Sequence, residues 1–241
     1  MQIVEDFAEN PEEKIALDEL LLDKAERGEV GETLRFWSSN KYFIVVGRSG
    51  KVSEECYVKL CRDENVKIIR RVSGGGTVLQ GPGCLNWSAV ISYARNEKYR
   101  NINGSYRSIL EPVTNRLKDK GFNASFFPIS DIALNEKKIS GNAQARKRKY
   151  FLHHGTFLLD FDLDKVSHYL QYPPKEPDYR QKRGHKDFLA NIYISCEELK
   201  EIIMKTFCVF ENIWRPSEKD MLELKGYAEK KYLNVDWNYA F

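Results

Sequence analysis

The chain has 241 residues, of which 42% are hydrophobic, 12% aromatic and 30% charged. This composition is typical of a soluble globular protein with a substantial core, and it excludes collagen-like and disordered classes. Lys and Arg number 38 against 35 Asp and Glu, so the formal charge of +3 is too balanced for a general nucleic-acid-binding protein. No apolar run approaches the ~18 residues of a membrane span, and the acidic first residues show no secretory signal. We therefore expect a cytoplasmic protein with neither a nucleic-acid nor a membrane partner.

The cysteines give no sign of a disulfide framework or a zinc site. Their number is odd, and no pair has CxxC or zinc-ligand spacing. We expect all five to be reduced, small hydrophobic residues. They are Cys56, Cys61, Cys84, Cys196 and Cys208.

The first half of the chain mixes helical and strand-like patterns. Asn10 and Pro11 open a helix that Gly28 ends, because Asn caps a first turn and Gly suits the left-handed position after a last turn. Two more helices are predicted, from Ser53 to about Glu64 and from about Ser105 to Lys120. Runs rich in β-branched and aromatic residues predict strands at 33–37, 42–46, 67–72 and 86–93.

The second half continues the mixture. Strands are predicted at 125–127, 131–134, 138–143 and 150–160, and helices at 163–170, from Ser195 to about Phe210, and at 216–230. A Pro- and charge-rich loop spans 172–187. Because strands and helices do not alternate strictly, we predict one α+β domain over residues 1–241, with a mixed, mostly antiparallel β-sheet flanked by helices.

A glycine-rich segment is the first candidate for chemistry. Gly74, Gly75 and Gly76 follow Arg70 and Arg71 closely. Glycines let a ligand approach backbone N–H groups, and guanidinium groups suit carboxylates and phosphates. The segment is neither GxxxxGK[ST] nor GxGxxG, so the common nucleotide fingerprints are absent. A tight turn beside ordinary surface arginines is the alternative, and the two interpretations stay open.

A lysine-bearing strand is the second candidate. Strand alternation predicts Lys138, Ser140 and Asn142 on one face, with the intervening residues on the other. A functional Lys138 would be a fixed positive charge beside phosphate and carboxylate oxygens. A solvated lysine on a polar sheet face is the simpler alternative.

The third candidate is the sequence His153-His154-Gly155-Thr156. Adjacent strand residues point to opposite faces, so the two histidines cannot chelate one metal together. The other histidines, His168 and His185, add no ligand spacing, so we predict no zinc site. One histidine of the pair should face the core or the site, and a purely structural role is the alternative.

In this order and spacing, the three segments resemble the lipoate–protein ligase family of the biotinyl/lipoyl protein ligase superfamily. Arg70–Val78 matches the family's Arg–Arg–x–Ser/Thr–Gly–Gly–Gly–x–Val, Lys138–Ala143 its Lys–Ile–Ser–Gly–x–Ala, and His153–Thr156 its His–His–Gly–Thr. The resemblance extends from about Ile15 to Trp237. It implies the class II synthetase-like catalytic domain of that superfamily, in a short form without the accessory C-terminal domain.

The resemblance implies an enzyme that activates lipoate or octanoate with ATP to an acyl-AMP. The acyl group then passes to a lysine of a lipoyl carrier domain, in a 2-oxoacid dehydrogenase or an H-type protein of glycine cleavage. Lys138 is the implied catalytic residue. Mg²⁺ is expected with triphosphate chemistry, and Asp131 is the candidate to bind or support it. The implied ATP-binding residues are Arg71, Gly76, Thr77, Val78, Leu79, Gln80, Lys138 and Thr156. The implied lipoate-binding residues are Arg71, Ser73, Gly74, Gly75, Lys138 and His154.

This chain departs from the family pattern in two places. Gln80-Gly81 stands where the family often has His–Asp, and Ser130-Asp131 replaces a usual Asn–Asp. The accessory domain is expected to be a separate subunit if it is needed, and the activation step would then depend on it. The segment 179–186 is strongly basic and is expected to close over the adenylate. The basic run 146–149 is interpreted either as a solvated turn or as a docking patch for acidic carrier domains.

Two other functions stay open. Octanoyl- or lipoyltransferases of this superfamily move the acyl group between carriers with a cysteine nucleophile and no ATP. Neither place where relatives carry that cysteine has one here: Phe151 stands at one, and residues 126–130 span the other. Only Cys84 lies near the glycine segment. The other alternative is a noncatalytic acyl-binding subunit, against which the retained Lys138 argues.

Overall fold

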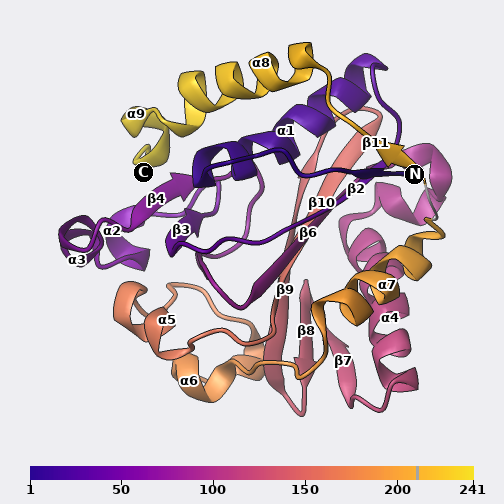
Figure 1. The fold of residues 1–241 in the computed structure, drawn as a ribbon. Coiled ribbons are helices and arrows are strands. Elements are labelled where there is room, and N and C mark those ends of the chain that lie inside the picture. Colours follow the sequence, from indigo (N-terminus) through magenta and orange to yellow (C-terminus); the bar gives the residue numbers. More distant parts are fainter. Residues whose placement is uncertain (210–211) are drawn as a thin grey trace.

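The computed structural model describes residues 1–209 and 212–241, in which strands and helices are interspersed along the chain (Figure 1). The strands are β1 (Gln2–Val4), β2 (Thr33–Trp37), β3 (Phe43–Val46), β4 (Lys67–Arg70), β5 (Val78–Gln80), β6 (Cys84–Ser92), β7 (Ala124–Phe127), β8 (Asp131–Leu134), β9 (Lys137–Arg146), β10 (Tyr150–Leu158) and β11 (Ile213–Trp214). The helices are α1 (Pro11–Arg27), α2 (Val52–Glu55), α3 (Val58–Asp63), α4 (Ile102–Asp119), α5 (Asp164–Tyr169), α6 (His185–Phe188), α7 (Cys196–Phe207), α8 (Glu218–Tyr227) and α9 (Val235–Asn238). Short 3₁₀ turns are η1 (Tyr93–Arg95), η2 (Glu97–Arg100) and η3 (Asp178–Arg180), and η4 (Ala228–Tyr232) is a π turn.

The large sheet confirms the predicted α+β class. Its strand order is β11-β1-β2-β6-β10-β9-β8-β7. Within the described residues, only β1 pairs in parallel in this sheet, with β11 and with β2, and every other neighbouring pair is antiparallel. The prediction of a mixed, mostly antiparallel sheet is therefore confirmed.

A second, three-stranded sheet has the order β4-β3-β5. Strand β3 pairs in parallel with β4 and antiparallel with β5. The glycine-rich segment connects β4 to β5, so it lies at one end of this small sheet.

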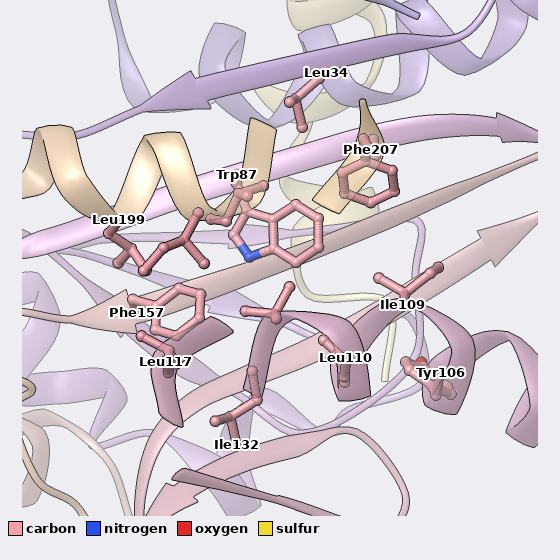
Figure 2. Packing of buried hydrophobic residues seen from close by; sticks show 14 of the residues in the cluster. Leu34, Trp87, Tyr106, Ile109, Leu110, Leu117, Ile132, Phe157, Leu199 and Phe207 are labelled. Carbon is pink, nitrogen blue, oxygen red and sulfur yellow. The ribbon is translucent and has the colours of Figure 1, made fainter. Parts of the chain in front are cut away.

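Helices cover both faces of the large sheet (Figure 1). Helices α4 and α7 pack on one face, where Trp87 lies at the centre of a fully buried core (Figure 2). Helices α1 and α8 belong to the core on the opposite face. The alternation of strand residues divides the two cores: Phe151 belongs to the first and Leu152 to the second. No helix in the described part of the chain is both long and apolar enough to cross a membrane.

The N-terminal helix forms as its local sequence predicts. The Asn10 side chain accepts a hydrogen bond from the Glu13 N–H at 2.9 Å, and Pro11 occupies the first helical turn. Gly28 ends the helix with φ of 79°, the left-handed conformation that glycine adopts without strain.

One predicted helix is wrong as a continuous element. The span from Ser53 to Glu64 divides into α2 and α3, because Cys56 is extended, with φ of −130° and ψ of 147°. Cys56 forms an isolated antiparallel bridge with Leu170, and the neighbouring Tyr57 N–H donates to the Tyr169 carbonyl at 3.0 Å. Pairing with a distant segment thus overrides the local helical pattern. The predicted end of another helix, at Phe210, lies outside the described residues.

Candidate active site

Two adjacent cavities lie between the small sheet and the β8–β10 part of the large sheet. The larger has a volume of ≈ 600 Å³ and the smaller ≈ 140 Å³. Segment 173–189, which includes η3 and α6, lines the larger cavity only. The shared lining residues form the junction between the cavities: Gly76, Thr77, Val78, Ser130, Asp131, Lys138, Gly141 and Thr156.

Lys138 stands at this junction and is held by one carboxylate. Its Nζ lies 2.9 Å from Oδ1 of Asp131, and the lysine side chain is 25% exposed against 8% for the aspartate. The other oxygen, Oδ2, accepts a hydrogen bond from the Tyr179 hydroxyl at 2.8 Å. Lys138 is therefore a fixed cation that faces both cavities while its partner is sheltered from water.

The strand carrying Lys138 does not alternate as predicted. The β8–β9 register shifts between Ile132 and Ala133, so that Ser140 pairs with Ile132 but Lys138 pairs with Ala133. Ile139 has no opposite residue, which is the signature of a β-bulge. Lys138 consequently lies over Gly141 instead of sharing the face of Ser140, and a Cβ at position 141 would be 2.8 Å from the lysine Nζ.

The glycine-rich segment is held in place by Arg71. This guanidinium is buried and donates to the carbonyls of Val45 (3.1 Å), Gly74 (2.6 Å) and Gly76 (2.9 Å), and to Oγ of Ser73 (2.9 Å). Burial lowers the pKa of Arg71 to about 10. Most N–H donors of Arg71 are thus used in hydrogen bonds that hold the glycine-rich segment, and the side chain lines only the smaller cavity.

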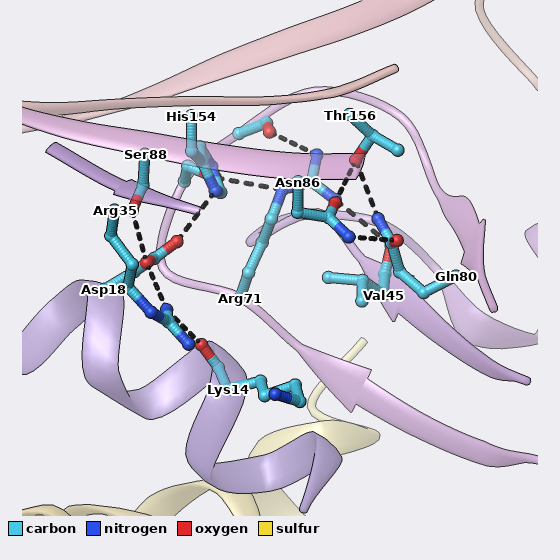
Figure 3. A network of polar contacts seen from close by, with 12 residues as sticks. Lys14, Asp18, Arg35, Val45, Arg71, Gln80, Asn86, Ser88, His154 and Thr156 are labelled. Atoms are coloured by element: carbon cyan, nitrogen blue, oxygen red, sulfur yellow. Dashed lines mark hydrogen bonds and ion pairs between the residues drawn. The ribbon is translucent and has the colours of Figure 1, made fainter. Parts of the chain in front are cut away.

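A buried polar network closes one side of the smaller cavity (Figure 3). The Ser73 hydroxyl lies 2.6 Å from Nε2 of His154, and Nδ1 of that histidine is 3.4 Å from Oδ2 of Asp18. Asp18 Oδ1 accepts from Arg35 and Ser88, each at 2.7 Å. Burial alone would raise the pKa of Asp18, but the hydrogen bonds from His154 and Ser88 and the charge of Arg35 lower it overall. The network ties α1 to the glycine segment and β10.

The two adjacent histidines divide as the strand geometry predicts. His153 is fully buried beside Trp87, with ring centroids 4.9 Å apart, and its Nδ1 lies 3.2 Å from the Gln144 amide. Burial lowers the pKa of His153 to about 3, so it is neutral at ordinary pH. His154 is on the other face and lines the smaller cavity.

A second short chain of polar contacts connects Gln80, Asn86 and Thr156 (Figure 3). The Gln80 amide donates to Oγ1 of Thr156 at 2.8 Å, and the Asn86 amide donates to Oε1 of Gln80 at the same distance. The Thr156 hydroxyl in turn donates to Asn86. These contacts orient Thr156, which lines both cavities.

The structure brings most of the expected site residues together. The larger cavity is lined by Gly76, Thr77, Val78, Leu79, Lys138 and Thr156 from the expected ATP set. Gln80 and Arg71 of that set line only the smaller cavity. From the expected lipoate set, Arg71, Gly75, Lys138 and His154 line the smaller cavity, whereas Ser73 and Gly74 line neither and contact Arg71.

Other lining residues were not singled out from the sequence. Asp18 lines the smaller cavity. The sequence indicated this only by placing a carboxylate among the buried apolar residues of α1. Glu55 lines the larger one, and its Oε2 accepts the Thr77 N–H at 3.2 Å.

Arg180 also lines the larger cavity. Its Cζ lies 4.8 Å from the ring centroid of Tyr172 and 4.8 Å from that of Phe188, and its Nη2 has no hydrogen-bond partner in the described part of the chain. Arg180 belongs to the basic segment 179–186, which is expected from the sequence to close over the adenylate.

The surroundings of Asp131 do not fit direct coordination of Mg²⁺. Both of its oxygens have other partners, and the Lys138 ammonium at 2.9 Å would repel a divalent cation. Among residues 1–209 and 212–241, no group of three or more His, Cys, Asp or Glu residues could hold a metal ion. A supporting role for Asp131, through Lys138, fits this geometry better than a ligand role.

Comparison with known proteins decides the family. The model of the lipoyl protein ligase A/B catalytic domain matches residues 10–208. The chain belongs to this family. Lipoate–protein ligase 1 of Staphylococcus aureus is 28% identical over 209 residues, which are 83% of this chain and 62% of that protein. The chain thus spans less than two thirds of the length of that relative.

Members of the family with different activities are similar to this chain. The octanoyltransferase LipM of Halalkalibacterium halodurans is 24% identical over 263 residues, covering 95% of both proteins. A solved structure described as a bi-partite lipoate protein ligase with its E2 lipoyl domain, from Thermoplasma acidophilum, has a TM-score of 0.82 at 24% identity. The match covers 99% of this chain and 95% of that chain, and it shows the shared fold.

Proposed function

We propose that this protein is an ATP-dependent lipoate–protein ligase. In the first step a carboxylate oxygen of lipoate or octanoate attacks the α-phosphorus of ATP, the bond to the β-phosphate oxygen breaks, and acyl-AMP and pyrophosphate form. In the second step the amino group of a carrier lysine attacks the acyl carbon, giving an amide and AMP.

The observation that carries this proposal is the meeting of two cavities at Lys138. The larger cavity, ≈ 600 Å³, has the size of a site for a ligand such as a nucleotide, and we assign the acyl chain to the smaller cavity of ≈ 140 Å³ that adjoins it. A carboxylate at the end of the smaller cavity and an α-phosphate in the larger would both contact the Lys138 ammonium. Such a fixed cation stabilises the negative charge that moves between the two groups in the transition state.

The residues around Lys138 have separate roles in this proposal. Gly76 and Thr77 line the junction, where the Thr77 N–H is held by Glu55 and the Gly76 carbonyl by Arg71. Thr156 offers a hydroxyl held by Gln80 and Asn86. Arg180 supplies a further cation in the larger cavity, which Arg71 does not line. Mg²⁺ would be bound by the triphosphate, and we assign it no ligand from the chain.

The second candidate is transfer of an octanoyl or lipoyl group between carriers without ATP, and similarity to an octanoyltransferase over 95% of both lengths favours it. The cysteines argue for the ligase. All five are described and free, and none of them lines either cavity. Burial raises the pKa of Cys84 to about 12, so its thiol is a poor nucleophile at neutral pH.

We further propose that the acyl acceptors are lipoyl domains of 2-oxoacid dehydrogenases or H-type proteins, and that the protein works in the cytoplasm. The description of the Thermoplasma acidophilum ligase with an E2 lipoyl domain supports such an acceptor. We also propose that residues 1–241 form one catalytic unit.

The test offers the purified chain an apo lipoyl domain together with one of two donors. One arm contains lipoate and ATP, and the other an octanoyl-loaded carrier without ATP. Modification of the domain in the first arm only supports the ligase, and modification in the second arm only supports the transferase. If the first arm reacts only after a second subunit is added, activation depends on that subunit.

A further inference from the structure

Tyr179 makes an unusual contact for a residue outside the cavities. It lines neither cavity, yet its hydroxyl donates to Asp131, whose other oxygen holds the catalytic lysine. Its ring stacks on Phe127 with centroids 4.3 Å apart, and it also packs against Phe188 at 5.1 Å. The phenol thus packs against two aromatic rings and donates its one hydrogen bond to one carboxylate oxygen.

Tyr179 belongs to segment 172–190, and other residues of this segment contact β9, the strand that carries Lys138. Arg183 Nη2 donates to the Glu136 carbonyl at 3.1 Å, and the Ala190 N–H donates to the carbonyl of Lys138 itself at 3.0 Å. The segment therefore lines the larger cavity and contacts the lysine strand at Lys138 itself and just before it, at Glu136. Of these three contacts, only that of Tyr179 is made to Asp131, the residue that holds the Lys138 side chain.

We propose that Tyr179 is a positioning residue that fixes Lys138 through Asp131 when segment 172–190 lies over the larger cavity. A carboxylate held at Oδ2 by the phenol presents only Oδ1 to the ammonium, which sets where Nζ stands between the cavities. Without the phenol, either oxygen is available, and the carboxylate and the lysine rotate together. The lysine would then spend less time where it contacts both reacting groups, and chemistry would slow.

This inference rests on the proposed ligase function, and it deepens the assignment of Lys138. Because the Tyr179 hydroxyl contacts no cavity, its loss should leave substrate binding intact. Because it acts only through Asp131, its effect should disappear when Asp131 can no longer hold the lysine. Both consequences differ from those of a merely structural side chain.

The experiment compares Tyr179→Phe with Tyr227→Phe. The first variant keeps the stacked ring and removes the hydroxyl. The second removes a hydroxyl that donates to Oδ2 of Asp23 at 2.7 Å, and because neither Tyr227 nor Asp23 lines a cavity, it is a matched control. In lipoate-dependent ATP–pyrophosphate exchange, we expect Tyr179→Phe to lower kcat about tenfold with KM for ATP within twofold, and the control to match the wild type.

A double-mutant cycle with Asp131→Asn tests the route. In that background Tyr179→Phe should have no further effect on kcat. An unchanged kcat for the single variant, an effect confined to KM, or an equal effect in both backgrounds would overturn the inference.

A second readout does not depend on ligase activity. The rate at which Lys138 is acetylated by acetic anhydride, measured by mass spectrometry of its peptide, should rise severalfold in Tyr179→Phe and stay unchanged in Tyr227→Phe. If the wild type shows no exchange but the labelling responds as expected, the ligase proposal fails while the positioning of Lys138 stands. If exchange occurs and labelling and kcat are both unchanged, only the role of Tyr179 fails.

Discussion

Replacing Lys138 with Met is the sharpest test of the assigned chemistry. Methionine keeps an unbranched stem over Gly141, where no Cβ crowds it, and removes the charge at the junction of the cavities. The ammonium now lies 2.9 Å from Asp131, in a side chain that is only one quarter exposed.

The expected magnitude follows from the loss of one charge. A unit charge about 4 Å from a phosphate oxygen, at an effective dielectric constant of about 20, contributes about 4 kcal/mol, which is roughly a 10³-fold change in rate. The variant also leaves the Asp131 carboxylate facing the phosphates without its partner, so we expect a loss of at least that size. Adding Asp131→Asn removes this repulsion, so the double variant should react about tenfold faster than Lys138→Met alone.

The assay is lipoate-dependent exchange of pyrophosphate into ATP, which reports adenylate formation without an acceptor. Binding of lipoate, measured separately by calorimetry, should weaken far less than exchange, because the acyl chain still has its cavity. Exchange by Lys138→Met within tenfold of the wild type would refute the role given to this lysine.

Three further predictions concern the surroundings of the site. Cys84→Ala should keep acyl transfer within about twofold of the wild type, because the thiol is buried away from both cavities, and an inactive but folded variant would revive the thiol transferase. Arg180→Gln should weaken ATP binding about tenfold or more but not adenosine binding, measured by calorimetry. Lys182→Gln is the control, because Lys182 is an exposed charge on the same segment and lines neither cavity. If the two variants bind ATP with equal affinity, Arg180 does not bind the phosphates. The contribution of His153 to the free energy of unfolding should fall by roughly 1.4 kcal/mol for each pH unit between pH 6.5 and about 3. In that range His153 binds a proton in the unfolded chain but not in the folded protein. His153→Gln should flatten that slope in denaturant titrations, and an unchanged slope would contradict the assignment.

The local features of the fold follow from the sequence because their causes lie within a few residues. Asn10, Pro11 and Gly28 bound the first helix by capping and left-handed geometry alone. The division of His153 and His154 between core and cavity follows from strand alternation. Neither prediction needed a distant partner.

The failures have causes far away in the chain. Cys56 leaves its helix because it pairs with Leu170, and the bulge at Ile139 depends on how β8 aligns with β9. Alternation on one strand carries no information about either, so Lys138 was placed beside the wrong neighbours.

The candidate site shows the same limit. The glycine segment and Lys138 were visible as patterns, but Tyr179 lies 48 residues from its partner Asp131, and Arg35 lies 17 from Asp18. The sequence alone also left the orientation of Arg71 open. Only the fold shows that its guanidinium binds the carbonyls of its own segment, while Arg180 lines the larger cavity.

The most direct test of the central claim is detection of the acyl-adenylate itself. The purified chain is incubated with lipoate and ATP without an acceptor, and the bound product is released and identified by mass spectrometry. We predict lipoyl-AMP together with pyrophosphate in the wild type and neither in Lys138→Met. Absence of the adenylate from an active preparation that loads a lipoyl domain from an octanoyl carrier would contradict the ligase account.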